Sequence, residues 1–358
     1  MKNKTLFPLI AIVFLLTQGI CLAAPQAAKS SADDLGFRIV PNEAAERVDV
    51  FYGKELFTAY IYPKTIKKPV LYPIKTASGT SITRGFPLEP KAGERVDHPH
   101  HVGLWFNFGD VNGLDFWNNS EAIKPSERDK FGTIVHKSIK RTAGGKDRGE
   151  LEVVMEWITP TGKALLREET TFVFHAAKGM RSIDRITKLT ALDEPVLFKD
   201  NKEGVIGLRV TRALEQPATR PEVFTDASGK ATPVPVLNNE GVTGLYHSSE
   251  GKTGDDVWGT RGKWTALSGK ISQEDVTILM LDNPRNPGFP TYWHARGYGL
   301  FAANTLGQKA LSNGKDELNY KLEPKQSGIF RYRILILNEP FNTDSMEKQY
   351  ARFTSETN

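Results

Sequence analysis

The sequence is short of cysteine, and this shortage excludes several kinds of chemistry. Cys21 is the only cysteine in 358 residues, and it lies in an N-terminal segment that we expect to be removed. The mature chain then has no disulfide, no cysteine nucleophile and no thiolate metal site. An exported chain without disulfides depends on a large core. About 330 mature residues can supply one, as one large β domain or two smaller units.

Long apolar runs and one-signed charge are also missing. The apolar run at residues 6–16 is the longest, and nothing later approaches the roughly 20 apolar residues of a membrane-spanning helix. The 47 Lys and Arg are interspersed with 42 Asp and Glu, which leaves a formal net charge of only +5. We therefore expect no integral membrane span and no nucleic-acid partner. Walker, HExxH, GxSxG and strand–helix GxGxxG motifs are absent, which argues against nucleotide chemistry and standard serine hydrolysis.

A positive start, an apolar centre and a zone of small residues follow one another at the N-terminus. This order predicts a secretory signal peptide at residues 1–23, cleaved after Ala23 or Ala24, and hence a periplasmic or secreted protein. A disordered leader is expected at residues 24–36. A lipoprotein signal that uses Cys21 is the less favoured alternative, because the residues before it fit that pattern poorly.

From residue 37 onward, short apolar runs alternate with Gly, Pro, Asn and Asp, which is typical of strands and turns. Such runs lie at residues 48–52, 56–62, 132–137, 151–157, 165–174, 180–189, 204–209, 276–282, 298–303 and 328–337. Several of them show a period of two, with one apolar face. We therefore predict that residues 37–358 form a single all-β domain, a large antiparallel β-sandwich with few short helices.

Three segments depart from this strand pattern. Residues 342–345 offer helix caps for a predicted helix at residues 346–353. Residues 112–128 and 212–262 are rich in polar and turn-forming residues and are predicted to be long loops. Loops of this length in a compact domain often form the rim or lid of a site, although an inert excursion is the alternative.

The densest group of chemically active side chains is the histidine segment at residues 97–110. His98, His100 and His101 are three of the seven histidines. Imidazole titrates near neutral pH and is a common metal ligand. A strand that starts at His101 would divide the following residues between two faces. The polar face would hold His101, Gly103, Trp105 and Asn107, and the core face Val102, Leu104, Phe106 and Phe108.

A face that presents Trp, His and Asn suits a sugar ring, because aromatic planes cover C–H patches while imidazole and amide groups bond hydroxyls. The polar loop after this strand adds further candidates for substrate contact: Asp110, Asp115, Trp117 and Asn118. The alternative interpretation is a hydrogen-bonded structural cluster without chemistry.

A second constellation lies at residues 290–299. His294 and Arg296 share a face if this segment is extended, with Trp293 and Tyr298 beside them. Arginine binds carboxylates or a developing oxyanion through its fixed fork. A surface turn with one packed tryptophan is the alternative.

A third group is the polar stretch at residues 199–204. Here Glu203 is a candidate general base and Lys202 a candidate charge partner, although a solvated hairpin explains five polar residues equally well. Arg84 is a weaker candidate for substrate contact, since a lone arginine is usually a surface residue.

The three constellations together resemble a bacterial family named PmoA or "methane oxygenase PmoA". The matching stretches are residues 98–106, 109–117, 202–204 and 293–304. The family usually has Arg at position 102 and Val-Arg-Asp at positions 295–297, so the charges at 102 and 297 are absent from this chain. The methane monooxygenase subunit of similar name is a membrane protein, so we do not expect methane oxidation. The resemblance implies a galactose-mutarotase-like β-supersandwich, a group whose members mostly act on or bind carbohydrates.

Three functions follow from these residues. The first is an exported enzyme for a sugar or glycoside, in which His101 and His294 exchange protons, Glu203 or Asp115 assists, and Arg296 holds a carboxylate or an oxyanion. Its reaction could be an epimerisation, a hydrolysis or a β-elimination.

The second function is carbohydrate binding without chemistry, with Trp105, Trp117 and Trp293 as stacking platforms. The third is a divalent metal site for Zn²⁺ or Cu²⁺ on His98, His100 and His101, or on two of these with His294.

Overall fold

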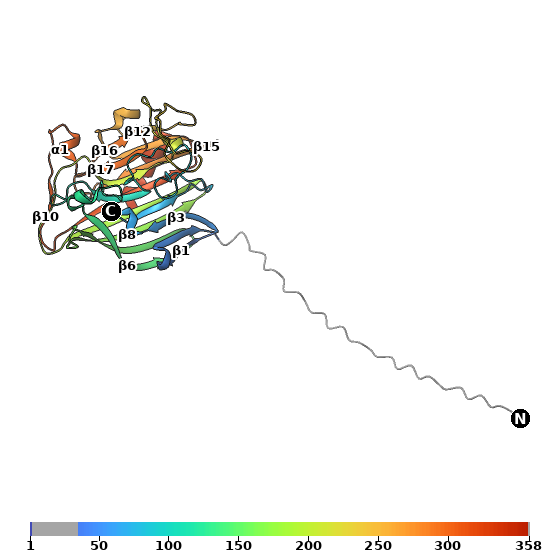
Figure 1. Cartoon of the computed structure of the whole chain (residues 1–358), viewed down its shortest axis with the longest axis horizontal. Coiled ribbons are helices and arrows are strands. Elements are labelled where there is room, and N and C mark those ends of the chain that lie inside the picture. Colours follow the sequence, from blue (N-terminus) through green and yellow to red (C-terminus); the bar gives the residue numbers. More distant parts are fainter. Residues whose placement is uncertain (2–34, 357–358) are drawn as a thin grey trace. The chain divides into compact units, whose positions relative to one another are not determined.

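Two large antiparallel sheets pack face to face in the computed structural model, which describes Met1 and residues 35–356 (Figure 1). Residues 35–356 belong to one compact unit. The predicted signal peptide, its cleavage site and most of the predicted leader lie outside the described residues. The predicted all-β antiparallel sandwich is confirmed. In the described part of the chain, no helix has the length and apolar character needed to cross a membrane.

The first sheet has nine strands, of which the fifth and the eighth in spatial order carry residues of the histidine segment and of the second constellation. In spatial order they are β1 (Phe37–Asn42), β2 (Arg47–Tyr52), β3 (Glu55–Ile61), β4 (Val70–Ile74), β5 (Leu104–Phe108), β11 (Gly204–Arg209), β17 (Leu300–Asn304), β16 (Thr291–Arg296) and β13 (Arg261–Gly262).

The second sheet has eight strands and is built mostly from long hairpins. Its order is β12 (Leu245–Ser248), β14 (Trp264–Ile271), β15 (Glu274–Asp282), β19 (Ser327–Leu337), β9 (Met180–Ala191), β8 (Ala164–Ala177), β7 (Arg148–Ile158) and β6 (Thr133–Ala143). A small sheet pairs β10 (Val196–Phe198) with β18 (Tyr320–Leu322). At one edge, β1 of the first sheet lies beside β6 of the second (Figure 1).

Helices are short in the described chain and lie outside the two sheets. They are the α-helices α1 (Gln308–Leu311) and α2 (Thr343–Glu356), and the 3-10 turns η1 (Glu43–Ala45), η2 (Lys64–Ile66), η3 (Pro125–Lys130), η4 (Arg212–Leu214) and η5 (Gly254–Val257). The predicted C-terminal helix is confirmed as α2, and the Asn342 side chain accepts the Ser345 N–H at its start. Met346 and Phe353 of α2 pack on Trp264 and Leu335 of the second sheet.

The main core fills the space between the sheets, because alternate residues of both point inward. Phe106 on β5 packs against Trp157 on β7 with ring centroids 6.4 Å apart. A second, smaller apolar cluster covers the outer face of the nine-stranded sheet and includes Trp105, Trp117 and Ala302. This outer face is where the candidate site lies.

The prediction for the start of the histidine strand is wrong. The strand β5 begins at Leu104, and Gly103 before it has φ +56°, a left-handed conformation that breaks the extended alternation. A Cβ at Gly103 would lie 2.2 Å from the Leu71 carbonyl oxygen, so only glycine fits. Val102 consequently joins the outer cluster with Trp105 instead of the main core.

Candidate functional site

A cross-strand row on the outer face of the nine-stranded sheet joins two of the predicted constellations. Trp105 on β5 pairs with Gly207, Gly207 pairs with Ala302, and Ala302 pairs with His294 on β16. Three strand spacings place the Trp105 and His294 backbones roughly 14 Å apart. A Cβ at Gly207 would lie 2.5 Å from the Trp105 ring, so the indole lies over this glycine. The row therefore has large side chains at its ends and small residues between them.

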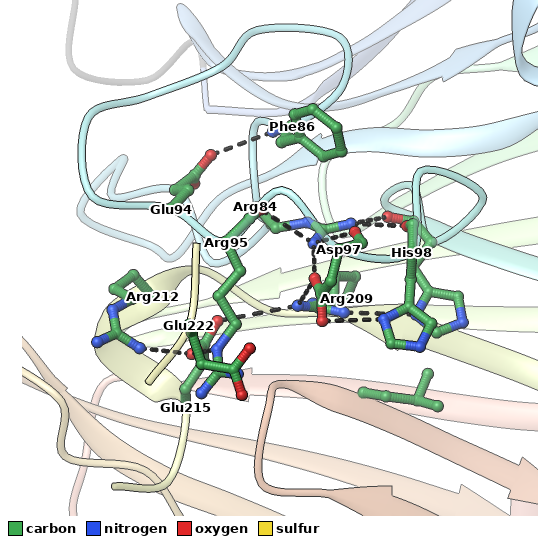
Figure 2. Close-up of polar contacts among 12 residues, drawn as sticks. Arg84, Phe86, Glu94, Arg95, Asp97, His98, Arg209, Arg212, Glu215 and Glu222 are labelled. Atoms are coloured by element: carbon green, nitrogen blue, oxygen red, sulfur yellow. Dashed lines mark hydrogen bonds and ion pairs between the residues drawn. The ribbon is translucent and has the colours of Figure 1, made fainter. Parts of the chain in front are cut away.

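His98 and Asp97, in the loop before β5, form a hydrogen-bonded pair (Figure 2). The His98 Nδ1 lies 2.9 Å from Asp97 Oδ2, while Arg84 Nη1 and Arg209 Nη2 each donate to Asp97 Oδ1 at 2.6 Å. Both arginine side chains are fully buried, whereas 39% of the His98 side chain is exposed. Among residues 35–356, His98 Nε2 has no hydrogen-bond partner. An accessible imidazole nitrogen is thus held in place through a carboxylate.

The electrostatics of this pair keep Asp97 ionised. Burial alone would raise the pKa of Asp97, but the charges of Arg209 and Arg84 and the hydrogen bond from His98 hold it well below its usual range. Arg84 also donates to the carbonyl oxygens of Asp97, His98 and His101, at 2.9, 3.0 and 3.2 Å. The buried guanidinium therefore fixes the backbone of the histidine loop as well as the carboxylate.

The same network continues away from His98 through a second buried carboxylate. Glu215 lies 3.9 Å from Arg209 and accepts from Arg95 Nε and Arg212 Nη1 at 2.7 Å each (Figure 2). Burial raises the pKa of Glu215, and the three arginines around it act in the opposite direction. Arg95 reaches outward to Glu222 at 2.8 Å. This chain of ion pairs ties the loop before β5 to the segment after β11.

Four aromatic rings, of which His98 is one, lie in nearly parallel planes. Tyr298 and His101 each have ring centroids 4.8 Å from His98, at interplanar angles of 5° and 2°, and Trp105 lies 5.1 Å from His101 at 16°. His101 itself is buried, and burial lowers its pKa well below the usual value, so its ring is neutral near pH 7. Burial likewise raises the pKa of Tyr298 to about 12, so its hydroxyl stays protonated.

Within the described chain, several buried nitrogen atoms of these and neighbouring rings have no hydrogen-bond partner. His100 Nε2, His101 Nε2, Trp105 Nε1 and Trp117 Nε1 are buried without a partner among the described residues. Lys68 lies beside these rings, and its Nζ donates to the His100 carbonyl oxygen at 2.7 Å. Burial lowers the pKa of Lys68 to about 7, against the opposing charge of Asp115.

His294 forms a second imidazole–carboxylate arrangement on the same outer face. Its Nδ1 lies 2.8 Å from the Lys202 carbonyl oxygen and 3.8 Å from Glu203 Oε2, and Lys202 forms an ion pair with Glu203. Burial lowers the pKa of His294, and the charge of Glu203 opposes this shift. With Nδ1–H donated to the Lys202 carbonyl, Nε2 of the neutral ring is an acceptor.

A cavity of about 360 Å³ opens beside the end of β16. Tyr298, Arg296 and Trp258 line it together with Arg95 and Glu222 of the ion-pair network. The Arg296 guanidinium carbon lies 5.3 Å from the centroid of a Trp258 ring. Since Tyr298 both lines the cavity and stacks on His98, the cavity adjoins the Asp97–His98 pair.

Comparison with known proteins gives a family but no activity. Residues 47–351 match the family described as "Family of unknown function (DUF6807)". The chain belongs to this family. No curated protein matches it. The resemblance to PmoA-named proteins stays a prediction.

Solved structures with a similar fold share little sequence with this member of the family. The galactosidase domain of the α-galactosidase–sucrose kinase AgaSK shows 11% identity and a TM-score of 0.40, over 85% of this chain and 42% of its own. The α-galactosidase AgaB from Geobacillus stearothermophilus shows 10% identity and a TM-score of 0.43, over 86% and 42%. A galactose mutarotase-like protein from Clostridium acetobutylicum shows 12% and 0.36, over 86% and 99%. Similarities at this level of identity and TM-score say nothing about the activity of this chain.

Several predicted site residues lie together on the outer face: His98, His100, His101, Trp105, Trp117, Lys202, Glu203, His294, Arg296, Tyr298 and Arg84. Arg84 is not the surface residue that its isolation suggested. Burial also changes the roles of two others, since Trp105 and Trp117 are fully buried and cannot be open stacking platforms.

Other predicted residues hold loops or the core. Trp293 faces the main core and donates to the Gly262 carbonyl oxygen, so its predicted place in the site is wrong. Asn107 is buried and donates to the Phe116 carbonyl oxygen at 2.6 Å. Asp110 accepts the Gly113 N–H at 3.0 Å.

Asp115 builds a turn instead of presenting a free base. It accepts the Trp117 and Asn118 N–H groups and the Asn118 side-chain amide, at 2.7 to 2.9 Å. Burial raises the pKa of Asp115, and these hydrogen bonds act in the opposite direction. The lone pairs of the Asp115 carboxylate are therefore largely committed to the loop, and the Asn118 side-chain amide is held there as a donor.

The histidine cluster does not have the geometry of the predicted Zn²⁺ or Cu²⁺ site. The His98 and His101 rings stack at 2°, so their nitrogens lie in parallel planes and do not converge on one point. His98 Nδ1 is already bonded to Asp97. In the part of the chain that the structure describes, no group of three or more His, Cys, Asp or Glu side chains is placed to hold a metal ion.

Sequence reasoning missed three residues of the site. Asp97 directly precedes His98, and a carboxylate next to a histidine could have been noticed as an orienting partner. Arg209 ends an apolar strand and Trp258 lies in a predicted loop, and nothing local distinguishes either from a surface residue. Their roles depend on pairing between strands that are far apart in sequence.

Proposed function

We propose that this chain is an exported carbohydrate-active enzyme in which His98, oriented by Asp97, transfers protons to and from a sugar. The observation that carries the proposal is the accessible His98 imidazole, bonded through Nδ1 to a carboxylate that two fully buried arginines keep ionised. A surface histidine has no need of such support. The signal-like N-terminus supports export.

His98 has the arrangement of a general acid–base group. Asp97 accepts the Nδ1–H, so the lone pair of the neutral ring is on Nε2, which can take a proton from a sugar hydroxyl or an acidic C–H. The imidazolium that forms is stabilised by the Asp97 carboxylate 2.9 Å away. Returning the proton to another atom of the substrate restores the neutral ring.

His294 is the second proton-transfer group of this proposal; it is 3% exposed, but its Nε2, unlike that of His101, is not among the fully buried nitrogens without a partner. Its Nδ1–H donates to the Lys202 carbonyl oxygen, and Glu203 at 3.8 Å stabilises the protonated ring. Two imidazoles let one group remove a proton while the other delivers one. This suits an epimerisation, and a β-elimination or hydrolysis uses the same pair. His98 thus takes the role that sequence reasoning gave to buried His101.

The adjoining cavity has the character of a sugar site. Its volume of about 360 Å³ falls in the range of small-molecule pockets. Tyr298 and Trp258 offer aromatic surface to C–H groups, while Gln216 and the arginines offer donors to hydroxyls. A protein that only binds sugars would need exposed tryptophans as stacking platforms, whereas Trp105 and Trp117 are buried. This burial is the main argument against a non-catalytic role.

Turnover of a glycan panel by purified protein tests the proposal. Reactions run in D₂O and followed by NMR report both bond cleavage and exchange of sugar C–H for C–D. We expect His98→Gln to lower kcat by about 10²–10⁴-fold, the usual contribution of a general acid–base group. His175→Gln on the second sheet is the control and should keep wild-type turnover. Absence of turnover on the whole panel, or full activity of His98→Gln, contradicts the proposal.

A further inference from the structure

The cavity beside β16 is lined by more basic than acidic side chains. Arg95, Arg220 and Arg296 line it, together with the two acids Glu222 and Asp255. This excess of one basic side chain decides little by itself. What matters is which of these charges are already paired within the protein.

Three of the five charged groups have partners. Arg95 Nη1 lies 2.8 Å from Glu222, and its Nε donates to buried Glu215 at 2.7 Å. Asp255 Oδ1 accepts the Gln216 side-chain amide at 2.8 Å. Arg95 and Glu222 therefore neutralise one another, and Asp255 is held by a neutral donor.

Arg220 and Arg296 have no carboxylate partner within residues 35–356. The Arg296 guanidinium packs against the Trp258 ring at 5.3 Å, which restricts its orientation while leaving its N–H groups available. These two guanidinium groups outweigh the one carboxylate of the lining that is held only by a neutral donor, Asp255, so the lining keeps a net positive charge and a positive potential.

We infer that this cavity binds the carboxylate of an acidic sugar, a uronate, through Arg220 and Arg296. The inference rests on the proposed function and adds the class of substrate to it. A guanidinium fork matches the two oxygens of a carboxylate, while the Trp258 and Tyr298 rings cover the apolar patches of the sugar ring.

The position of Arg296 connects the cavity to the proton-transfer groups. Arg296 lies two residues after His294 on β16, so both side chains project from the same face of the strand. A carboxylate held at Arg296 brings its sugar ring toward His294 and the Tyr298–His98 stack. The C–H next to a carboxylate is unusually acidic for a sugar, which suits bases of imidazole strength.

Binding of matched methyl glycosides tests the inference. Isothermal titration calorimetry of the full chain compares methyl glucuronide with methyl glucoside, and methyl galacturonide with methyl galactoside, at low and high salt. We expect one acidic glycoside to bind at least about tenfold more tightly than its neutral parent, with the preference reduced by salt. Arg296→Gln and Arg220→Gln should each remove most of the preference, and Arg296→Lys should restore part of it.

The matched control is Arg38→Gln. Arg38 is also exposed and lies over an aromatic ring, 4.8 Å from the Phe51 centroid, but on β1 outside the cavity. It should keep the wild-type preference. Equal affinity for acidic and neutral glycosides, or a preference that survives both cavity substitutions, overturns the inference and leaves the carbohydrate function standing. No binding of any glycoside overturns the inference together with that function.

Discussion

Replacing Asp97 by Asn should destabilise the fold far more than an ordinary loss of an ion pair. The change keeps the shape of the side chain but leaves the fully buried Arg84 and Arg209 without their shared counterion. Breaking a buried pair in this way costs about 3–5 kcal/mol. With an unfolding entropy of about 2.1 cal/mol/K per residue over roughly 320 residues, the cost corresponds to a fall in Tm of about 4–7 °C.

Calorimetry of Asp97→Asn against Asp49→Asn measures this difference. Asp49 also pairs with an arginine, Arg47, but both side chains are partly exposed, so its loss should cost less than about 1 kcal/mol. Equal shifts in Tm for the two variants would refute the argument that Asp97 holds a buried charge network together.

Two further predictions concern the protonation and the backbone of the histidine loop. Burial lowers the pKa of His100 and of His101 in the folded protein, so below about pH 6.5 the unfolded chain binds more protons and stability falls as the pH falls. Urea unfolding at pH 7.5 and at pH 5.5 should show a loss of about 3 kcal/mol between the two, about 1.4 kcal/mol for each histidine. No loss would contradict this prediction. Gly103→Ala should destabilise by several times the roughly 1–2 kcal/mol expected for Gly79→Ala, because both glycines have positive φ but only Gly103 has a carbonyl oxygen 2.2 Å from the added Cβ. If urea unfolding shows the same loss of stability for Gly103→Ala and Gly79→Ala, the fold relieves this close contact and the prediction is wrong.

Much of the fold was predictable because strand alternation and turn residues are local signals. The runs at 151–157 and 165–174 became β7 and β8, whose apolar faces form the core, and the capped helix became α2. The start of β5 was not predictable from alternation. Residue 103 is left-handed and must be glycine, because the Leu71 carbonyl oxygen of another strand leaves no room for a Cβ.

The chemistry of the candidate site was not predictable from the sequence. His98 and Tyr298 stack on one another, and His294 projects from β16 on the same outer face of the sheet. Which histidine is accessible could not be read from the sequence, because the burial of His101 and the exposure of His98 depend on the whole loop. The counterion role of Arg209 likewise arises only when β11 pairs with β5.

A double-mutant cycle on kcat/KM tests most directly whether Asp97 and His98 act as one unit. Turnover is measured for the wild type, Asp97→Asn, His98→Gln and the double variant, on the glycan that the panel identifies. We predict that Asp97→Asn lowers the wild-type rate strongly but has little further effect once His98 is replaced, because Asp97 acts through that imidazole. Losses that simply multiply in the double variant would contradict the proposed role of the Asp97–His98 pair.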